Sequence, residues 1–303
     1  MSTLPVFPLF KPVAIEDRDI FVPILRKYQP ETSEWTFTNL FIWREHYDFR
    51  WSMYQDCLMV ISAQAGSAFA MQPVGPSSRK DVVSALLTWL RDELGVPTPS
   101  IERADTRLVR ELEGAARLAI EPVRDHFDYV YLKDDLAELP GNRYRAKRNR
   151  INKMSREYVF TYAPLEERHL SQCLDLQSNW CNARRCKEDL SLLGEWKAIE
   201  EILNNFNALD VRGGVVVIDG RVGAFTVGEL LNDTTAVIHI EKADPDIAEL
   251  YTVVNQQCAG KCWGNIRYIN REQDLGIPGL REAKLSYHPD HMVEKYRVTL
   301  LTP

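Results

Sequence analysis

The chain has 303 residues, of which 45% are hydrophobic and 26% charged, and its formal net charge is −6. The composition excludes intrinsic disorder, the length fits two domains better than one, and the negative charge argues against DNA as a partner. No stretch approaches the roughly 18 apolar residues of a transmembrane helix, and the amino terminus lacks the pattern of a signal peptide, so we expect a cytoplasmic location.

Short helix and strand signals alternate in the first part of the chain. The predicted elements are helices over 17–28 and 80–94 and strands over 57–62, 68–74 and 127–132. This order predicts an antiparallel-rich sheet with flanking helices.

A polar break containing Asp134, Asp135, Pro140 and Gly141 follows the last of these strands. Clusters of such residues are typical of connections between structured segments. We therefore expect one domain over 1–133 and a second over 134–303.

The second half has clearer periodicity. Its predicted elements are a basic helix, a strand over 158–164, helices over 166–180 and 194–207, strands over 213–220, 221–230 and 234–243, a helix over 250–264, a strand over 266–270, a helix over 279–287 and a strand over 296–301. The Asp219-Gly220 pair is a strong hairpin signal. The order predicts an α/β (α+β) domain like those of GNAT acyltransferases, with a mostly antiparallel mixed sheet between helices.

Three blocks carry a family resemblance: LPGNRYRAKRNRINKMSREY, VGAFTVGEL with AVIHIEKAD, and INREQDLGIPGLREAKLSYHP. In them the chain resembles bacterial proteins of unknown function that share the carboxy-terminal domain type of phosphatidylglycerol lysyltransferase. The resemblance implies a tandem GNAT fold whose first domain is a degenerate copy. It also implies transfer of an acyl or aminoacyl group to an amine or hydroxyl acceptor, with aminoacyl-tRNA as one possible donor.

The loop before the helix over 250–264 bears on the donor. CoA-dependent GNAT enzymes hold pyrophosphate with backbone amides of a glycine-rich loop at this place. Here the segment reads HIEKADPDIAELY, with Glu241, Asp244, Asp246 and Glu249 where an anion would bind. Acyl-CoA stays a possible donor, but we expect no ordinary use of acetyl-CoA, and aminoacyl-tRNA or another ligand is favoured.

Polar residues cluster where the strand over 266–270 ends, which is a usual place for a ligand site in a layered α/β sheet. The candidate catalytic residues are Glu241, Arg271, Glu272, Asp274 and Lys284. Candidate binding residues in the same region are His239, Asn270, Arg281 and Tyr287. An arginine or lysine could grip phosphate or carboxylate while a glutamate accepts a proton from an acceptor amine. The alternative is a buried ion-pair network without chemistry, and for His239 alone a core histidine is favoured over a catalytic base.

The basic segment supplies the candidates for donor binding, Arg148, Asn149, Asn152 and Lys153. They could contact tRNA phosphates or a phosphorylated small molecule, and a solvated helix face is the alternative. We expect no metal site, and the residues do not indicate a specific cofactor. A zinc site from Cys181, Cys186, Cys258 and Cys262 is the weaker alternative, because free cysteines usually pack as small apolar residues.

Two functions from different classes therefore stay open. The first is an acyl or aminoacyl transferase acting on a small-molecule or tRNA substrate. The second is a GNAT-derived module that binds a phosphorylated metabolite or RNA without catalysis.

Overall fold

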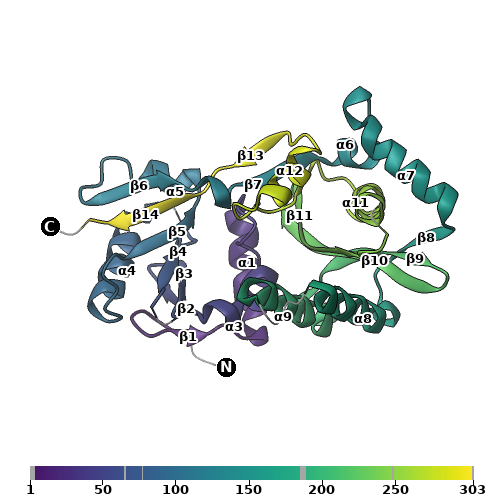
Figure 1. The fold of residues 1–303 in the computed structure, drawn as a ribbon. Helices are drawn as coiled ribbons and strands as arrows, with labels where there is room; N and C mark the ends of the chain where they lie inside the picture. Colours follow the sequence, from purple (N-terminus) through teal and green to yellow (C-terminus); the bar gives the residue numbers. More distant parts are fainter. Residues whose placement is uncertain (1–3, 65, 77, 185–188, 248, 302–303) are drawn as a thin grey trace. The chain divides into compact units, whose positions relative to one another are not determined.

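The computed structural model describes residues 4–64, 66–76, 78–184, 189–247 and 249–301 (Figure 1). These residues form two compact units that are each discontinuous in sequence. The first unit comprises Met1–Asp128, Gln273–Pro278 and Met292–Pro303, and the second comprises Tyr129–Glu272 and Gly279–His291.

The first unit is built on a seven-stranded sheet. Its strands lie in the order β1 (Lys11–Pro12), β2 (Phe49–Tyr54), β3 (Cys57–Ser62), β4 (Phe69–Met71), β5 (Ser100–Ala104), β14 (Tyr296–Leu300) and β6 (Leu118–Pro122). Strands β4 and β5 pair in parallel, and the other neighbouring strands of this sheet pair antiparallel. The carboxy-terminal strand β14 thus lies between two strands from the first half of the chain.

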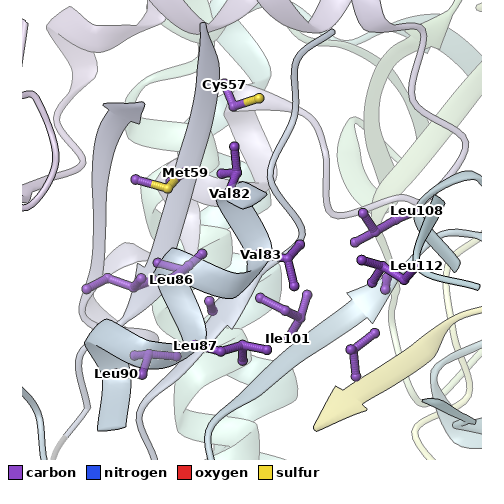
Figure 2. Packing of buried hydrophobic residues seen from close by; sticks show 14 residues of the cluster. Cys57, Met59, Val82, Val83, Leu86, Leu87, Leu90, Ile101, Leu108 and Leu112 are labelled. Atoms are coloured by element: carbon purple, nitrogen blue, oxygen red, sulfur yellow. The ribbon is translucent and has the colours of Figure 1, made fainter. Parts of the chain in front are cut away.

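Helices of the first unit surround this sheet. They are η1 (Ile15–Asp17), α1 (Arg18–Tyr28), α2 (Phe37–Ile42), α3 (Arg44–Tyr47), α4 (Lys80–Asp92), α5 (Thr106–Glu111) and η2 (Arg124–His126). Helix α4 buries one face because its apolar residues recur at helical spacing, including Val83, Leu86, Leu87 and Leu90. Figure 2 shows these side chains packed among residues of the sheet such as Met59 and Ile101.

The second unit contains a sheet of its own with the same number of strands. They lie in the order β13 (His291–Val293), β7 (Asp128–Leu132), β12 (Tyr268–Asn270), β11 (Thr235–Ala243), β10 (Arg221–Asn232), β9 (Arg212–Ile218) and β8 (Phe160–Pro164). The parallel pair here is β11 with β12. The turn between β9 and β10 has positive φ at Asp219 and Gly220, as expected for a two-residue hairpin.

Helix α11 packs on β9, β10 and β11, and α8 contacts β10 (Figure 1). The helices of this unit are α6 (Lys133–Glu138), η3 (Asn142–Tyr144), α7 (Arg145–Glu157), α8 (Glu167–Arg184), α9 (Leu190–Asn204), α10 (Phe206–Leu209), α11 (Leu250–Lys261) and α12 (Pro278–Leu285). The core under α11 includes Val216, Ala224, Val253 and Val254.

The two sheets share one plan. In each, an antiparallel run ends in a strand that pairs in parallel with the next, and a helix makes the crossover that parallel strands require, α4 in the first unit and α11 in the second. The second strand of each parallel pair then meets an antiparallel neighbour from elsewhere in the chain, β14 beside β5 and β7 beside β12. The mixed α/β class with mostly antiparallel sheets is therefore confirmed.

The two units are not two consecutive segments of the chain. Residues 129–133 group with the second unit and residues 292–303 with the first. The expected division into domains over 1–133 and 134–303 stays a prediction. Strand β14, from the second of these segments, pairs in the first sheet, and β7, from the first segment, pairs in the second sheet.

Candidate functional site

The candidate site of the second unit lies where β12 ends beside β11. Strand β12 leads into Arg271 and Glu272, while Glu241 lies on β11. Glu272 has φ of 57°, which is uncommon for a residue with a side chain, and its backbone N–H donates to Asn270 Oδ1 at 2.8 Å. The buried Asn270 side chain therefore holds the turn that places Arg271 and Glu272.

Arg271 and Glu241 form an ion pair in which both side chains are 14% exposed. Arg271 Nη2 donates to Glu241 Oε1 at 2.9 Å, and Asn255 Nδ2 donates to the other carboxylate oxygen at 3.0 Å. The guanidinium also lies 4.9 Å from the centre of the Tyr287 ring. Its Nη1 is buried and has no hydrogen-bond partner among the described residues. An N–H group that is buried without a partner can donate to a ligand oxygen.

His239 links two further carboxylates of this unit. Its side chain is 1% exposed, and its ring nitrogens lie 3.0 Å from Glu229 Oε1 and 2.9 Å from Glu272 Oε1. Burial alone would lower the pKa of His239, but the hydrogen bonds and charges of Glu229 and Glu272 outweigh it and raise the pKa to about 9. The ring is therefore charged at neutral pH and donates to both carboxylates, so it does not act as a proton acceptor.

Lys284 and Tyr287 support the turn from the following segment. Lys284 Nζ donates to the backbone carbonyls of Arg271 and Glu272, and the hydroxyl of Tyr131 donates to the carbonyl of Lys284 at 2.8 Å. The ring of Tyr287 is buried, and the pKa of its hydroxyl is raised first by burial. Both residues come close to Arg271, Lys284 by holding its backbone and Tyr287 by packing on its guanidinium.

Asp274 and Arg281 are placed differently. Asp274 groups with the first unit, where its carboxylate accepts from Gly276 N at 2.8 Å and from Arg124 Nη1 at 3.3 Å. Arg281 is half-buried on α12. The structure thus brings Glu241, Arg271, Glu272, His239, Asn270, Lys284 and Tyr287 together within one unit.

The four donor-binding candidates lie on α7. Arg148 donates to the carbonyls of Leu139 and Gly141, so it caps the preceding turn. Lys153 pairs with Glu249 at 2.8 Å. Asn149 and Asn152 are exposed.

Sequence reasoning did not select Lys147 and Asn255. Lys147 is only 7% exposed and lies on the stripe of Tyr144, Ile151 and Met154, whose helical spacing is visible in the sequence. Burial lowers its pKa to about 8, and the charges of Arg150 and Arg271 add to that effect. Asn255 left no comparable signal, because its contact with Glu241 depends on how α11 packs on the sheet.

In the structure, the acidic residues of the loop before α11 lie close to the start of this helix. Glu249 directly precedes the helix, and Asp244 Oδ1 accepts from Asp246 N at 3.0 Å. The hydrogen bond from Lys153 lowers the pKa of Glu249. Carboxylates therefore occupy the positive end of the helix dipole, where pyrophosphate would otherwise bind.

The zinc alternative rests in part on Cys186, which lies outside the described residues. Cys258 Sγ, on α11, lies 3.0 Å from the Sγ of Cys262, the residue that follows this helix. Within the described ranges, no three or more metal-ligating side chains are grouped to hold a metal ion. Nor does any helix described there have both the length and the apolar character needed to cross a membrane.

Comparison with solved structures confirms the tandem GNAT-like fold. A tandem GNAT protein from the clavulanic acid biosynthesis pathway matches 97% of this chain and 99% of its own, with a TM-score of 0.51 at 11% identity. L-PGS from Bacillus licheniformis has a TM-score of 0.62 at 12% identity, covering 94% of this chain and 92% of that one.

A more similar structure comes from Bacteroides thetaiotaomicron, a conserved protein of unknown function. It is 33% identical over 98% of this chain and 100% of that chain, with a TM-score of 0.90. No curated protein sequence matches the chain significantly. The family described as phosphatidylglycerol lysyltransferase, C-terminal, matches residues 25–299. The resemblance seen in the three sequence blocks is thus confirmed, and the chain belongs to the family of phosphatidylglycerol lysyltransferase carboxy-terminal domains.

Proposed function

We propose that the second unit transfers an acyl or aminoacyl group to an amine or hydroxyl acceptor at the end of β12. Family membership and the tandem GNAT-like fold support a transferase-like function. The observation that carries the proposal is the buried Arg271 guanidinium, which pairs with Glu241 through one nitrogen and presents another without a partner in the described part of the chain.

In the proposed reaction, the acceptor nitrogen or oxygen attacks the carbonyl carbon of the donor ester or thioester. Arg271 Nη1 donates to the carbonyl oxygen as negative charge develops on it. Glu241 accepts the proton that the acceptor loses. When the bond between the carbonyl carbon and the leaving oxygen or sulfur breaks, Glu241 gives this proton to the leaving atom. Catalysis requires no proton transfer by His239, whose charge instead fixes Glu229 and Glu272.

Aminoacyl-tRNA is the donor that the charges favour. The carboxylates of Asp244, Asp246 and Glu249 near the start of α11 would repel a CoA pyrophosphate at the place where GNAT enzymes hold it. An ester-linked aminoacyl group does not need that contact.

A ligand screen by thermal shift tests the donor. The full chain is heated with aminoacyl-tRNA, with uncharged tRNA and with acetyl-CoA, each at concentrations well above micromolar. Because a ligand that binds the folded state stabilises it increasingly as its concentration exceeds Kd, aminoacyl-tRNA should raise Tm by several degrees, more than uncharged tRNA. Stabilisation by acetyl-CoA alone would contradict the inference drawn from the acidic loop.

A further inference from the structure

A basic pocket lies in the second unit between α7 and α12. Its volume is about 480 Å³, and its polar lining comprises Arg143, Lys147, Arg150, Glu282, Ser286 and His288. The remaining walls are the small residues Ala146, Gly279 and Ala283, which leave the space open. Three lining residues are cationic and one is acidic, so the pocket attracts anions.

Among these residues, Lys147 gives the strongest indication that the pocket binds an anion. Only 7% of its surface is exposed, yet no carboxylate within the described ranges pairs with it. Its Nζ donates to Ser286 Oγ at 2.7 Å and lies 3.7 Å from the centre of the Tyr287 ring. An ammonium group carries three N–H donors, so donors remain for a ligand. A buried cation without a counter-charge is costly, and an anion in the pocket would remove that cost.

Arg150 and Arg143 differ in what they already bind. Arg143 Nη2 is held by Asp135 at 2.6 Å. Arg150 is exposed and makes no hydrogen bond or ion pair with another described residue. Its planar guanidinium can therefore bind two oxygens of one ligand group while Lys147 approaches from the buried side.

We propose that this pocket binds a small phosphorylated ligand through Lys147 and Arg150. A phosphate monoester carries close to two negative charges and three acceptor oxygens, which match one ammonium and one guanidinium group. The volume lies in the range of small-molecule sites and exceeds what a phosphate alone fills, so the ligand carries a further group against Ala146 and Ala283.

One aromatic ring, that of Tyr287, is shared by the pocket's Lys147 and by Arg271. Lys147 Nζ and the Arg271 guanidinium both pack on Tyr287, at 3.7 and 4.9 Å from its ring centre. A phosphate bound to Lys147 would thus contact a residue that shares the Tyr287 ring with Arg271. The proposal does not depend on that pair being catalytic, because the pocket has its own lining and charge.

Calorimetric titration of the full chain with pyrophosphate and with glycerol 3-phosphate tests the pocket. We expect binding of both probes, weakened roughly tenfold or more by Lys147→Met and by Arg150→Ala, since each removes a charge-assisted hydrogen bond. Ala283→Phe should also weaken binding by filling the pocket while leaving every charge in place. Arg145→Ala is the matched control, because Arg145 is an exposed cation of α7 outside the lining.

A second measurement follows Lys147 directly by NMR of the isotopically methylated lysines. Its pKa of about 8 should rise when pyrophosphate is added, because the anion favours the charged ammonium. The proposal is overturned if neither probe binds at physiological salt, or if Arg145→Ala weakens binding as much as Arg150→Ala. Binding of tRNA alone, with equal losses in all α7 variants, would instead indicate an extended nucleic-acid surface and would also overturn it.

Discussion

His239 shows how individual residues of the candidate site depend on one another. Its charged ring lies between Glu229 and Glu272, and the latter residue has a left-handed backbone conformation next to Arg271. Uncommon backbone conformations persist only where surrounding contacts hold them, and they concentrate at functional sites. The ring thus positions the turn that carries Arg271, although it does not transfer protons itself.

This arrangement makes stability depend on pH. The pKa of His239 is about 9 in the folded chain against an ordinary value of 6.5, so its contribution is complete below pH 6.5 and is lost as pH rises through 9. The shift corresponds to a contribution on the order of 3 kcal/mol. Unfolding by urea from pH 6 to 10 should show this loss in the wild type and not in His239→Gln. Parallel curves for the two proteins would contradict the assignment.

The residue contacts were only partly predictable. Sequence reasoning placed Arg271 and Glu272 at the end of a strand and Glu241 within the strand over 234–243, because strand and turn patterns are local. The partners of His239 lie 10 and 33 residues away, and their approach depends on the pairing of β10, β11 and β12. Apolar residues at helical spacing around Lys147 are visible in the sequence, but they do not reveal the pocket beside this lysine.

At the scale of elements, the close approach of β9 and β10 supports the strands that carry the site. Gly213 of β9 pairs with Val227. A Cβ atom at Gly213 would lie 1.9 Å from the backbone oxygen of Thr226, far closer than any stable contact. The strand therefore needs glycine at this position for steric reasons, and β10 in turn positions Glu229.

Replacing this glycine should reverse the usual effect of alanine in a strand. Alanine normally stabilises relative to glycine, but Gly213→Ala must move backbone and should lower the free energy of unfolding by roughly 2 kcal/mol. Gly279→Ala in α12 is the control, because a Cβ added there would meet no described atom within 4 Å, and the change should not destabilise the fold. Chemical denaturation gives the free energy of unfolding of both variants. Equal values for Gly213→Ala and Gly279→Ala would show that β9 and β10 can move apart to fit the added methyl group without loss of stability.

Most elements were predictable from sequence because their signals are local. The strand expected over 57–62 coincides with β3, and the helix expected over 80–94 contains α4. The hairpin signal Asp219-Gly220 coincides with the two-residue turn between β9 and β10, where Ile218 pairs with Arg221. Five of the strands in the described part of the chain went unpredicted. Strands β1 and β13 have only two and three residues, too few to show an alternation, whereas β2, β5 and β6 are longer and were also not identified.

Across the whole molecule, each half of the chain gives one strand to the sheet built mainly from the other half. Strand β14 pairs with β5 and β6 in the first sheet, and β7 pairs with β12 in the second. Lys295, just before β14, is fully buried in the first unit and pairs with Asp128 at 2.6 Å and Glu34 at 2.7 Å. The last segment is therefore part of the core of the first unit. Strand patterns predict that such a strand exists, but they do not indicate which sheet receives it.

The exchange predicts how fragments behave. A fragment of residues 1–133 lacks β14, which leaves β5 and β6 without their shared neighbour and exposes the apolar surface around Val298. We expect it to lack a cooperative thermal transition, whereas the full chain shows one. Circular dichroism and amide NMR spectra measure the difference. A fragment that melts cooperatively with dispersed amide signals would contradict this account.

If Glu241 and Arg271 perform group transfer, Glu241→Gln should lose turnover and keep donor binding, so we would measure both in this variant first. The substitution keeps the size of the side chain and removes its ability to accept a proton. Glu157→Gln, at the exposed end of α7, serves as the control. With the donor that stabilises the wild type, we predict that Glu241→Gln lowers turnover by roughly a hundredfold or more and leaves donor affinity within about threefold. A wild type that binds the donor without transferring its group, or equal turnover in the two variants, would contradict the claim and favour a binding module.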